Sequence, residues 1–442
     1  MKSALAFLFF GIFYSLAQAA DWNPIPCNAT SKCPDSAPCC NQYGMCGTGF
    51  YCLGGCDPRY SFNLTACMPQ PRMSSFQDLM SNASKIMDIN QYLGNASQAD
   101  WVYTGYINNA DGALLLQMPN QSTGTVVSST KYLWFGRVGA TIKTARDVGV
   151  VTAFITFSDV QDEIDYEFMG YDLEKPQTNF YSLGLLNYTN SKNYTTTDTY
   201  ENYHYYEIDW AEDQTQWIID GNVVRTLKRS DTWNLTKNRY DYPSTPSRVQ
   251  FSLWPAGSDL NALGTVQWAG GPINWNSQDI QDYGYYYAYV KNVSIKAYDL
   301  PSFVSGNSTN LSAFLYNSTT DFNEENVLLT NKKTWLGNQK AVGFNPQNDA
   351  STQSSQSSKS SASSSSSNTK TTKTTGSGSG STGMPIVTDS TTSNTFVGGF
   401  VQGGSTSAKG GSASASKSGA GADRASTAIG GFLAMIAGVF VF

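Results

Sequence analysis

The chain has 442 residues, 28 of them basic and 34 acidic, which gives a formal net charge of −6. No cluster of Lys and Arg stands out in this mildly acidic sequence, so nucleic acid is excluded as an expected partner. Aromatic residues make up 13% of the chain. This share suits the stacking of flat rings on sugars, and it equally suits the core of a β-sandwich.

The first residues predict a secretory signal over residues 1–19. Lys2 supplies the positive start, Ala4 to Leu16 form the apolar stretch, and Ala17-Gln18-Ala19 forms a small-x-small cleavage site. The alternative is a buried N-terminal helix. The sequence therefore predicts an extracellular protein.

All eight cysteines of the chain lie between Cys27 and Cys67. An even number of cysteines so close together in a secreted protein indicates a disulfide framework, and spacing alone does not choose among the many pairings. A zinc site is the weaker alternative, because the spacings are irregular and no His lies nearby. We expect a small disulfide-rich module over residues 20–72.

Residues 73–300 contain no cysteine and must fold on a hydrophobic core. Their apolar residues alternate with period two, and Asp220-Gly221 is a hairpin-turn signal. The pattern predicts an all-β domain, a β-sandwich, with a short helix at Phe76 to Met87. The expected strands include Gly149 to Phe157, Tyr203 to Trp210, Gln216 to Ile219, Val249 to Trp254 and Tyr285 to Ile295.

Apolar residues become sparse after Pro301, so we expect residues 301–349 to form a C-terminal extension. Residues 350–427 are almost wholly Ser, Thr, Gly, Ala and Lys, a composition typical of a disordered, O-glycosylated stalk. The apolar tail Ile429 to Phe442 is too short for a spanning helix. With its polar spacer it predicts a removed GPI signal over residues 428–442, and attachment of the anchor at Ser418 or Gly419.

The stretch Asp162 to Phe168 places Glu163, Asp165 and Glu167 at alternate positions. In a β-strand these three carboxylates share one face, and the residues between them point to the other. Like charges on one face cost stability, and chemistry is the usual reason for such a cost. Two carboxylates flanking a sugar bond are what glycoside cleavage requires. The alternatives are a solvated edge strand and a calcium site.

The run from Asp162 to Gly170 resembles the active-site signature Glu-x-Asp-x-Glu of glycoside hydrolase family 16, whose members are β-jelly rolls. The order and spacing of further blocks are similar over most of residues 90–300. The closest resemblance is to the fungal Crh family of GPI-anchored cell-wall chitin–glucan transglycosylases, and it extends to the layout of the whole chain. The further blocks are Trp134 to Val138, Gln177 to Tyr181, Tyr203 to Trp210 and Phe251 to Pro255.

This resemblance implies that Glu163 is the nucleophile, Glu167 the general acid/base and Asp165 an assisting group. It implies chitin and β-glucan as partners. We expect no cofactor and assign no residue as a metal ligand. Hydrolysis of chitin or β-glucan by the same residues remains an alternative, and a non-enzymatic wall lectin is a weaker one. By the same resemblance we expect sugar contacts from four residues, whose plainer interpretation is sandwich core: Asn179, Tyr181, Trp254 and Trp268.

The cysteine module resembles a hevein-type chitin-binding domain through the stretch Cys39 to Gly47 and through Tyr51-Cys52. The sugar-contacting positions of that family correspond to Asn41, Tyr43 and Tyr51, while Met45 replaces a stacking aromatic. Chitin binding and a structural role both remain open. The resemblance implies the pairs Cys27–Cys40, Cys33–Cys46, Cys39–Cys52 and Cys56–Cys67.

Overall fold

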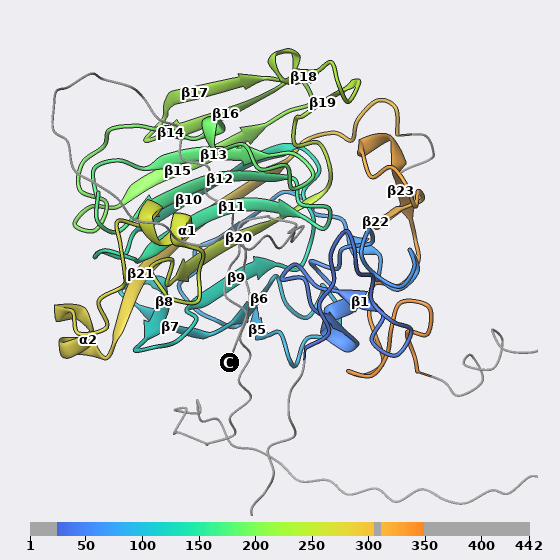
Figure 1. The fold of residues 1–442 in the computed structure, drawn as a ribbon, viewed down its shortest axis with the longest axis horizontal. Helices are drawn as coiled ribbons and strands as arrows, with labels where there is room; N and C mark the ends of the chain where they lie inside the picture. The colour runs from blue at the N-terminus through green and yellow to red at the C-terminus, as the bar shows by residue number, and fades with distance from the viewer. Residues whose placement is uncertain (1–23, 305–310, 349–442) are drawn as a thin grey trace, which may run out of the picture.

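The computed structural model describes residues 24–304 and 311–348 (Figure 1). The predicted signal peptide, stalk, anchor attachment at Ser418 or Gly419 and removed tail all lie outside the described residues. Within the described part of the chain, no helix is both long and apolar enough to cross a membrane.

Two large sheets stack as the layers of a sandwich (Figure 1). The all-β prediction for this domain is therefore confirmed. The first sheet contains, in spatial order, β14 (Lys192–Asn193), β13 (Gln177–Tyr181), β12 (Glu163–Met169), β11 (Val151–Ser158), β20 (Ser247–Trp254), β9 (Thr125–Ser129), β6 (Trp101–Thr104) and β5 (Ile86–Asp88).

The second sheet covers the other side of the core. It contains β17 (Asn222–Lys228), β16 (Gln214–Ile219), β15 (His204–Trp210), β10 (Gly136–Lys143), β21 (Tyr285–Ala297), β8 (Ala113–Pro119) and β7 (Tyr106–Ala110), and β4 (Phe76–Asp78) pairs with β21. Two short α-helices, α1 (Leu263–Trp268) and α2 (Gln278–Tyr283), follow β20.

Small elements complete the described residues. They are the pairs β1 (Cys39–Cys40) with β2 (Cys46–Gly47) and β18 (Trp233–Asn234) with β19 (Arg239–Tyr240), the sheet β23 (Val327–Thr330), β22 (Ala313–Tyr316) and β3 (Gln70–Pro71), and the 3-10 turns η1 (Gly49–Cys52), η2 (Tyr188–Asn190), η3 (Arg229–Thr232) and η5 (Glu324–Asn326).

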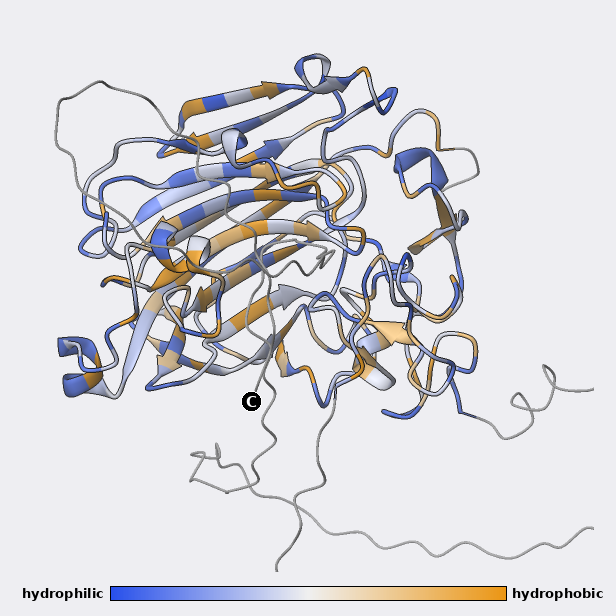
Figure 2. Ribbon diagram, viewed as in Figure 1, coloured by the Kyte–Doolittle hydropathy of each residue, from blue (hydrophilic) through white to orange (hydrophobic). Residues whose placement is uncertain are grey.

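The core lies between the two sheets because their strands alternate apolar and polar side chains, which Figure 2 shows as alternating orange and blue bands. Ile164, Tyr166 and Phe168 of β12 all point into this core. The ring of Tyr166 stacks on that of Phe154 in β11, with centroids 6.1 Å apart and planes 12° from parallel. The apolar half of the acidic strand thus anchors it in the sandwich.

The hairpin between β16 and β17 turns at Asp220 and Gly221, whose φ angles are 49° and 80°. Two consecutive positive φ values match the tight turn that Asp-Gly favours. The helix predicted at Phe76 to Met87 is wrong, because this stretch forms β4 and β5 instead. β4 pairs with β21 and β5 with β6, and these edge strands are too short to display a period of two.

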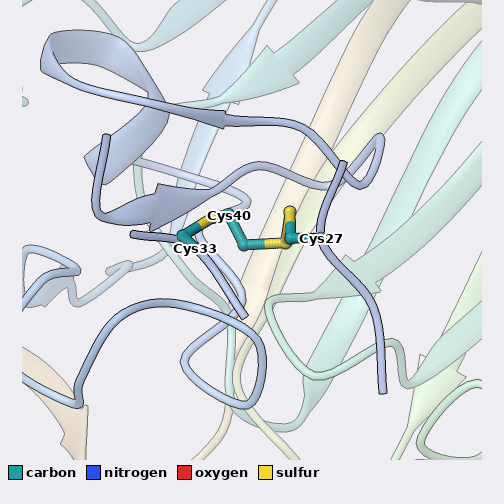
Figure 3. A group of neighbouring side chains, drawn as sticks. All are labelled: Cys27, Cys33 and Cys40. Carbon is teal, nitrogen blue, oxygen red and sulfur yellow. A yellow bond between two sulfur atoms is a disulfide. The ribbon is translucent and has the colours of Figure 1, made fainter. Parts of the chain in front are cut away.

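The cysteine module is held by four disulfides, Cys27–Cys40, Cys33–Cys46, Cys39–Cys52 and Cys56–Cys67. These are the four pairs that the resemblance to hevein implies. The sulfur atoms of Cys27, Cys33 and Cys40 lie within 4.8 Å of one another (Figure 3). This is the only such grouping among the described residues, and all three sulfurs are used in disulfides rather than as thiolate ligands.

Residues 311–348 pack on the cysteine module, so the extension and the module form one structural unit (Figure 1). β22 of the extension pairs with β3 at the end of the module. The backbone N–H of Gly49 donates to the carbonyl of Ala341 over 2.9 Å. Leu336 and Val342 lie in the same small core as Cys39 and Cys52.

The module also docks on the first sheet of the sandwich, at the side of β20, β9 and β6 (Figure 1). The backbone N–H of Gly55 donates to the carboxylate of Asp159 over 2.9 Å. Gln70 and Tyr132 donate to the same carboxylate over 2.7 and 2.6 Å. Burial raises the pKa of Asp159 to about 6, although these three donors and Arg248 favour its charged form.

Candidate active site

The three carboxylates lie near the middle of the first sheet, on the face that points away from the sandwich core. We call this face, made of the outward side chains of β13, β12, β11 and β20, the carboxylate face. Each acid lies in a row of side chains that runs across the sheet from β13 through β12 and β11 to β20. These rows are Tyr181–Glu163–Phe157–Arg248, Asn179–Asp165–Ile155–Gln250 and Gln177–Glu167–Ala153–Ser252.

Glu163, Asp165 and Glu167 are almost completely buried, with at most 2% of each residue exposed. Burial and the neighbouring charge of Glu167 raise the pKa of Glu163 to about 8, against an ordinary value of 4.5. Burial and both glutamates raise the pKa of Asp165 well above its ordinary range. A set of acids this close cannot all be ionised at neutral pH.

The position of Asp165 next to Glu163 decides where a proton resides. Neither Asp165 oxygen meets ordinary hydrogen-bond geometry with a described residue, yet the carboxyl is near enough for a protonated Asp165 to donate to Glu163. This donation lowers the pKa of Glu163 and raises that of Asp165. Asp165 therefore retains the proton, and Glu163 is the more readily ionised of the two.

The neighbouring Asp162 has a structural role, although it belongs to the same acidic stretch. Its carboxylate accepts from the backbone N–H of Leu183, Ser244 and Thr245, and from the Thr245 hydroxyl, over 2.7–2.9 Å. It therefore ties two loops to the start of β12. These bonds fix the point at which the alternating carboxylates begin.

Asn179 and Tyr181 of β13 lie opposite Asp165 and Glu163. The Asn179 amide donates to the Tyr181 hydroxyl over 2.7 Å. Burial and the charges of all three acids raise the pKa of Tyr181, so its hydroxyl stays protonated. Both residues predicted from the resemblance thus lie beside the carboxylates.

Trp254 and Trp268 also lie together on this face. Trp254 lies in the row of Met169 and Val151, two rows along the strands from the row of Asp165. The two tryptophan rings stack with centroids 6.1 Å apart and planes 27° from parallel. Trp268 comes from α1, and its indole N–H donates to the Gln177 side chain over 3.2 Å. Gln177 lies opposite Glu167 and was not singled out from the sequence. Both tryptophans belong to this face and not to the sandwich core.

The three hevein-like residues make contacts within the module and with the sandwich. The side chain of Asn41 accepts from the backbone N–H of Tyr43 and Met45, both over 3.0 Å. Tyr43 packs against the sandwich, where burial raises its pKa despite the charge of Arg248. The Tyr51 ring lies over Gly47, in contact with Phe50.

Sequence reasoning missed three polar residues of β20 that extend the rows of the carboxylate face. Arg248, Gln250 and Ser252 alternate with Val249, Phe251 and Leu253, which point into the core. Polar residues at every second position of an apolar strand were a visible signal. Gln42 of the cysteine module, which bonds Arg248 and Gln250, lies 206 and 208 positions away from them in sequence and could not be paired with them by pattern.

Comparison with known proteins places this chain in a family. Residues 95–270 match the model of glycosyl hydrolases family 16. The chain is 62% identical over 331 residues to the Crh-like protein UTR2 of Candida albicans, covering 73% of this chain and 70% of that protein. This protein belongs to the fungal Crh family within glycosyl hydrolases family 16.

Two further matches agree with this placement. The family member is 50% identical over 329 residues to Congo red hypersensitive protein 2 of Saccharomyces cerevisiae, covering 74% of this chain and 70% of that protein. A solved structure, Apo Crh5 transglycosylase, matches with a TM-score of 0.50 and 25% identity, covering 62% of this chain and 100% of that one. The protein is therefore an enzyme of the glycosidase and transglycosylase class.

Proposed function

We propose that this Crh family member is an extracellular retaining transglycosylase that cleaves β-1,4-linked chitin and transfers it to β-glucan acceptors of the fungal cell wall. The single observation behind the proposal is that a chain of family 16 has three carboxylates, Glu163, Asp165 and Glu167, at alternate positions along β12. Support for transfer comes from the solved relative that is itself described as a transglycosylase.

In the first step, the ionised carboxylate of Glu163 attacks the anomeric carbon of the donor sugar. The bond from that carbon to the leaving oxygen breaks, and Glu167 gives its proton to this oxygen. A glycosyl ester then joins the sugar to Glu163. Protonated Asp165 donates a hydrogen bond to Glu163, which stabilises the ionised carboxylate of the nucleophile before the attack.

In the second step, the Glu167 carboxylate removes a proton from an acceptor hydroxyl. The acceptor oxygen attacks the anomeric carbon, the ester bond to Glu163 breaks, and the original configuration is restored. If water replaces the sugar hydroxyl, the same residues perform hydrolysis, which is the alternative activity. Transfer dominates when the acceptor is held well enough to outcompete water.

Azide rescue tests the two roles. Glu163→Gln should abolish both transfer and hydrolysis. Glu167→Ala should keep slow attack on a donor with a good leaving group, and added azide should give a β-glycosyl azide. An α-azide product, or azide rescue of Glu163→Gln instead, would reverse the assignment.

We further propose that a GPI anchor holds the enzyme at the outer face of the plasma membrane and in the wall. The support is the sequence pattern of small residues near Ser418 and Gly419, a polar spacer and an apolar tail. Deleting residues 428–442 should release active enzyme into the medium. An unchanged membrane or wall fraction after this deletion would disprove the anchor.

A further inference from the structure

The cysteine module is bound to the carboxylate face through one side chain. The side-chain oxygen of Gln42 accepts from the Arg248 guanidinium over 2.6 Å and from the side-chain amide of Gln250 over 3.1 Å. Gly54 of the module lies so close to Arg248 that an added Cβ would come within 2.6 Å of the guanidinium. Gln42 therefore fixes the orientation of two residues on β20.

The strip of polar residues on β20 has unused hydrogen-bonding atoms. Arg248, Gln250 and Ser252 are each at most 3% exposed. Among the described residues, the side-chain oxygen of Gln250, the Ser252 hydroxyl and the Arg248 Nε have no hydrogen-bond partner. Buried polar atoms without partners are costly in a folded protein, so such a strip is suited to a ligand rich in hydroxyl and amide groups.

The strip is also in line with the reacting groups. Gln250 shares a row with Asp165, and Ser252 shares one with Glu167. Each pair is two strands apart, which is about 10 Å. A saccharide chain lying across the sheet from the carboxylates would pass over this strip before reaching the module.

Resting on the proposed function, we propose that Gln250 and Ser252 bind the saccharide chain away from the cleavage point, and that Gln42 of the cysteine module is the positioning residue for Gln250. The module is then part of the catalytic unit rather than an independent chitin binder. The use of the Asn41 side chain within its own loop agrees with this role.

The test measures binding of N-acetylglucosamine oligomers of increasing length to the Glu163→Gln protein, which cannot consume them. Adding Gln250→Leu should weaken binding of long oligomers about tenfold relative to short ones. Gln42→Ala should act in the same direction. Gln42→Glu keeps an oxygen that accepts from both Arg248 and Gln250, so it should restore binding. The exposed Gln98→Ala serves as the matched control.

The combination of Gln42→Ala with Gln250→Leu decides the positioning role. If Gln42 acts through Gln250, the double variant should bind no more weakly than Gln250→Leu alone. Additive losses, or length dependence unchanged in Gln250→Leu, would overturn the inference. Ser252→Ala should also weaken binding of long oligomers. Because the Ser252 hydroxyl makes no hydrogen bond to the module, this variant controls for misfolding of the module. These outcomes do not depend on transfer, so failure of the proposed function is recognised separately, by the products of the active protein.

Discussion

At the scale of single residues, the carboxylate face holds acids in surroundings that are unfavourable for their charged forms. Burial and the charges of neighbouring carboxylates raise the pKa of Glu163 and of Asp165, so their charged forms are disfavoured. Asn179 and Tyr181 provide neighbouring polar groups without a positive charge. The raised pKa values follow from this arrangement and are typical of catalytic acids.

The cost should appear as a dependence of stability on pH. The pKa of Glu163 is raised in the folded state, so its contribution to stability is present below the unfolded value near 4.5 and is lost as pH rises toward 8. A tenfold change in proton affinity is worth about 1.4 kcal/mol. We therefore expect Glu163→Gln to raise Tm by several degrees at pH 7, with little gain at pH 4.

Calorimetry of both proteins between pH 4 and 8 measures this gain, with the exposed Glu201→Gln as control. A Tm difference that stays constant or shrinks as pH rises would show that Glu163 is not destabilised by its surroundings.

At the scale of elements, the long strands could be predicted and their partners could not. β11 follows from a dense apolar run and β15, β20 and β21 from strand-like patterns in the sequence. The Asp220-Gly221 turn follows from residue type. The helix predicted at Phe76 to Met87 was wrong because this stretch becomes β4 and β5 by pairing with other strands, β21 and β6, and not through its local pattern.

The extension shows the same limit. Its sparse apolar residues gave no sign that Leu336 and Val342 complete the core of the cysteine module. Contacts between segments far apart in the chain leave no periodic signal. The carboxylates were predictable because all three lie at alternate positions of one strand. The hydrogen bond between Gln42 and Gln250 joins residues far apart in sequence and forms only in the folded protein.

Removing the extension should therefore destabilise the module. A chain ending at residue 304 loses β22, the partner of β3, and the side chains of Leu336 and Val342. Burial of such side chains is worth about 1.5–3 kcal/mol each. We expect the free energy of unfolding to fall by several kcal/mol and the module to become sensitive to protease.

Thermal unfolding and limited proteolysis on non-reducing gels would detect both effects, with a chain ending at residue 348 as the control. Equal melting and equal protease resistance would mean that the extension only decorates the module.

At the scale of the whole molecule, the module packs against one side of the first sheet of the sandwich, and the extension packs against the module. The module lies beside β20, β9 and β6, where Gln42 bonds Arg248. Gly55 of the module also bonds Asp159, which follows β11. The extension contacts the module through hydrogen bonds from the backbone N–H of Phe50 to the Gln339 side chain and from that of Gly49 to the Ala341 carbonyl. This arrangement favours an enzyme that holds extended saccharide chains, which is what transfer between two polymers requires.

The most direct test of this account is product analysis with two substrates. The full enzyme receives a chitin oligomer as donor and a labelled laminarin-type oligomer at saturating concentration as acceptor. The account predicts a labelled hybrid whose mass equals the acceptor plus a donor fragment, and Glu163→Gln should form none. Shortened chitin oligomers without any labelled hybrid would contradict it and identify the protein as a hydrolase.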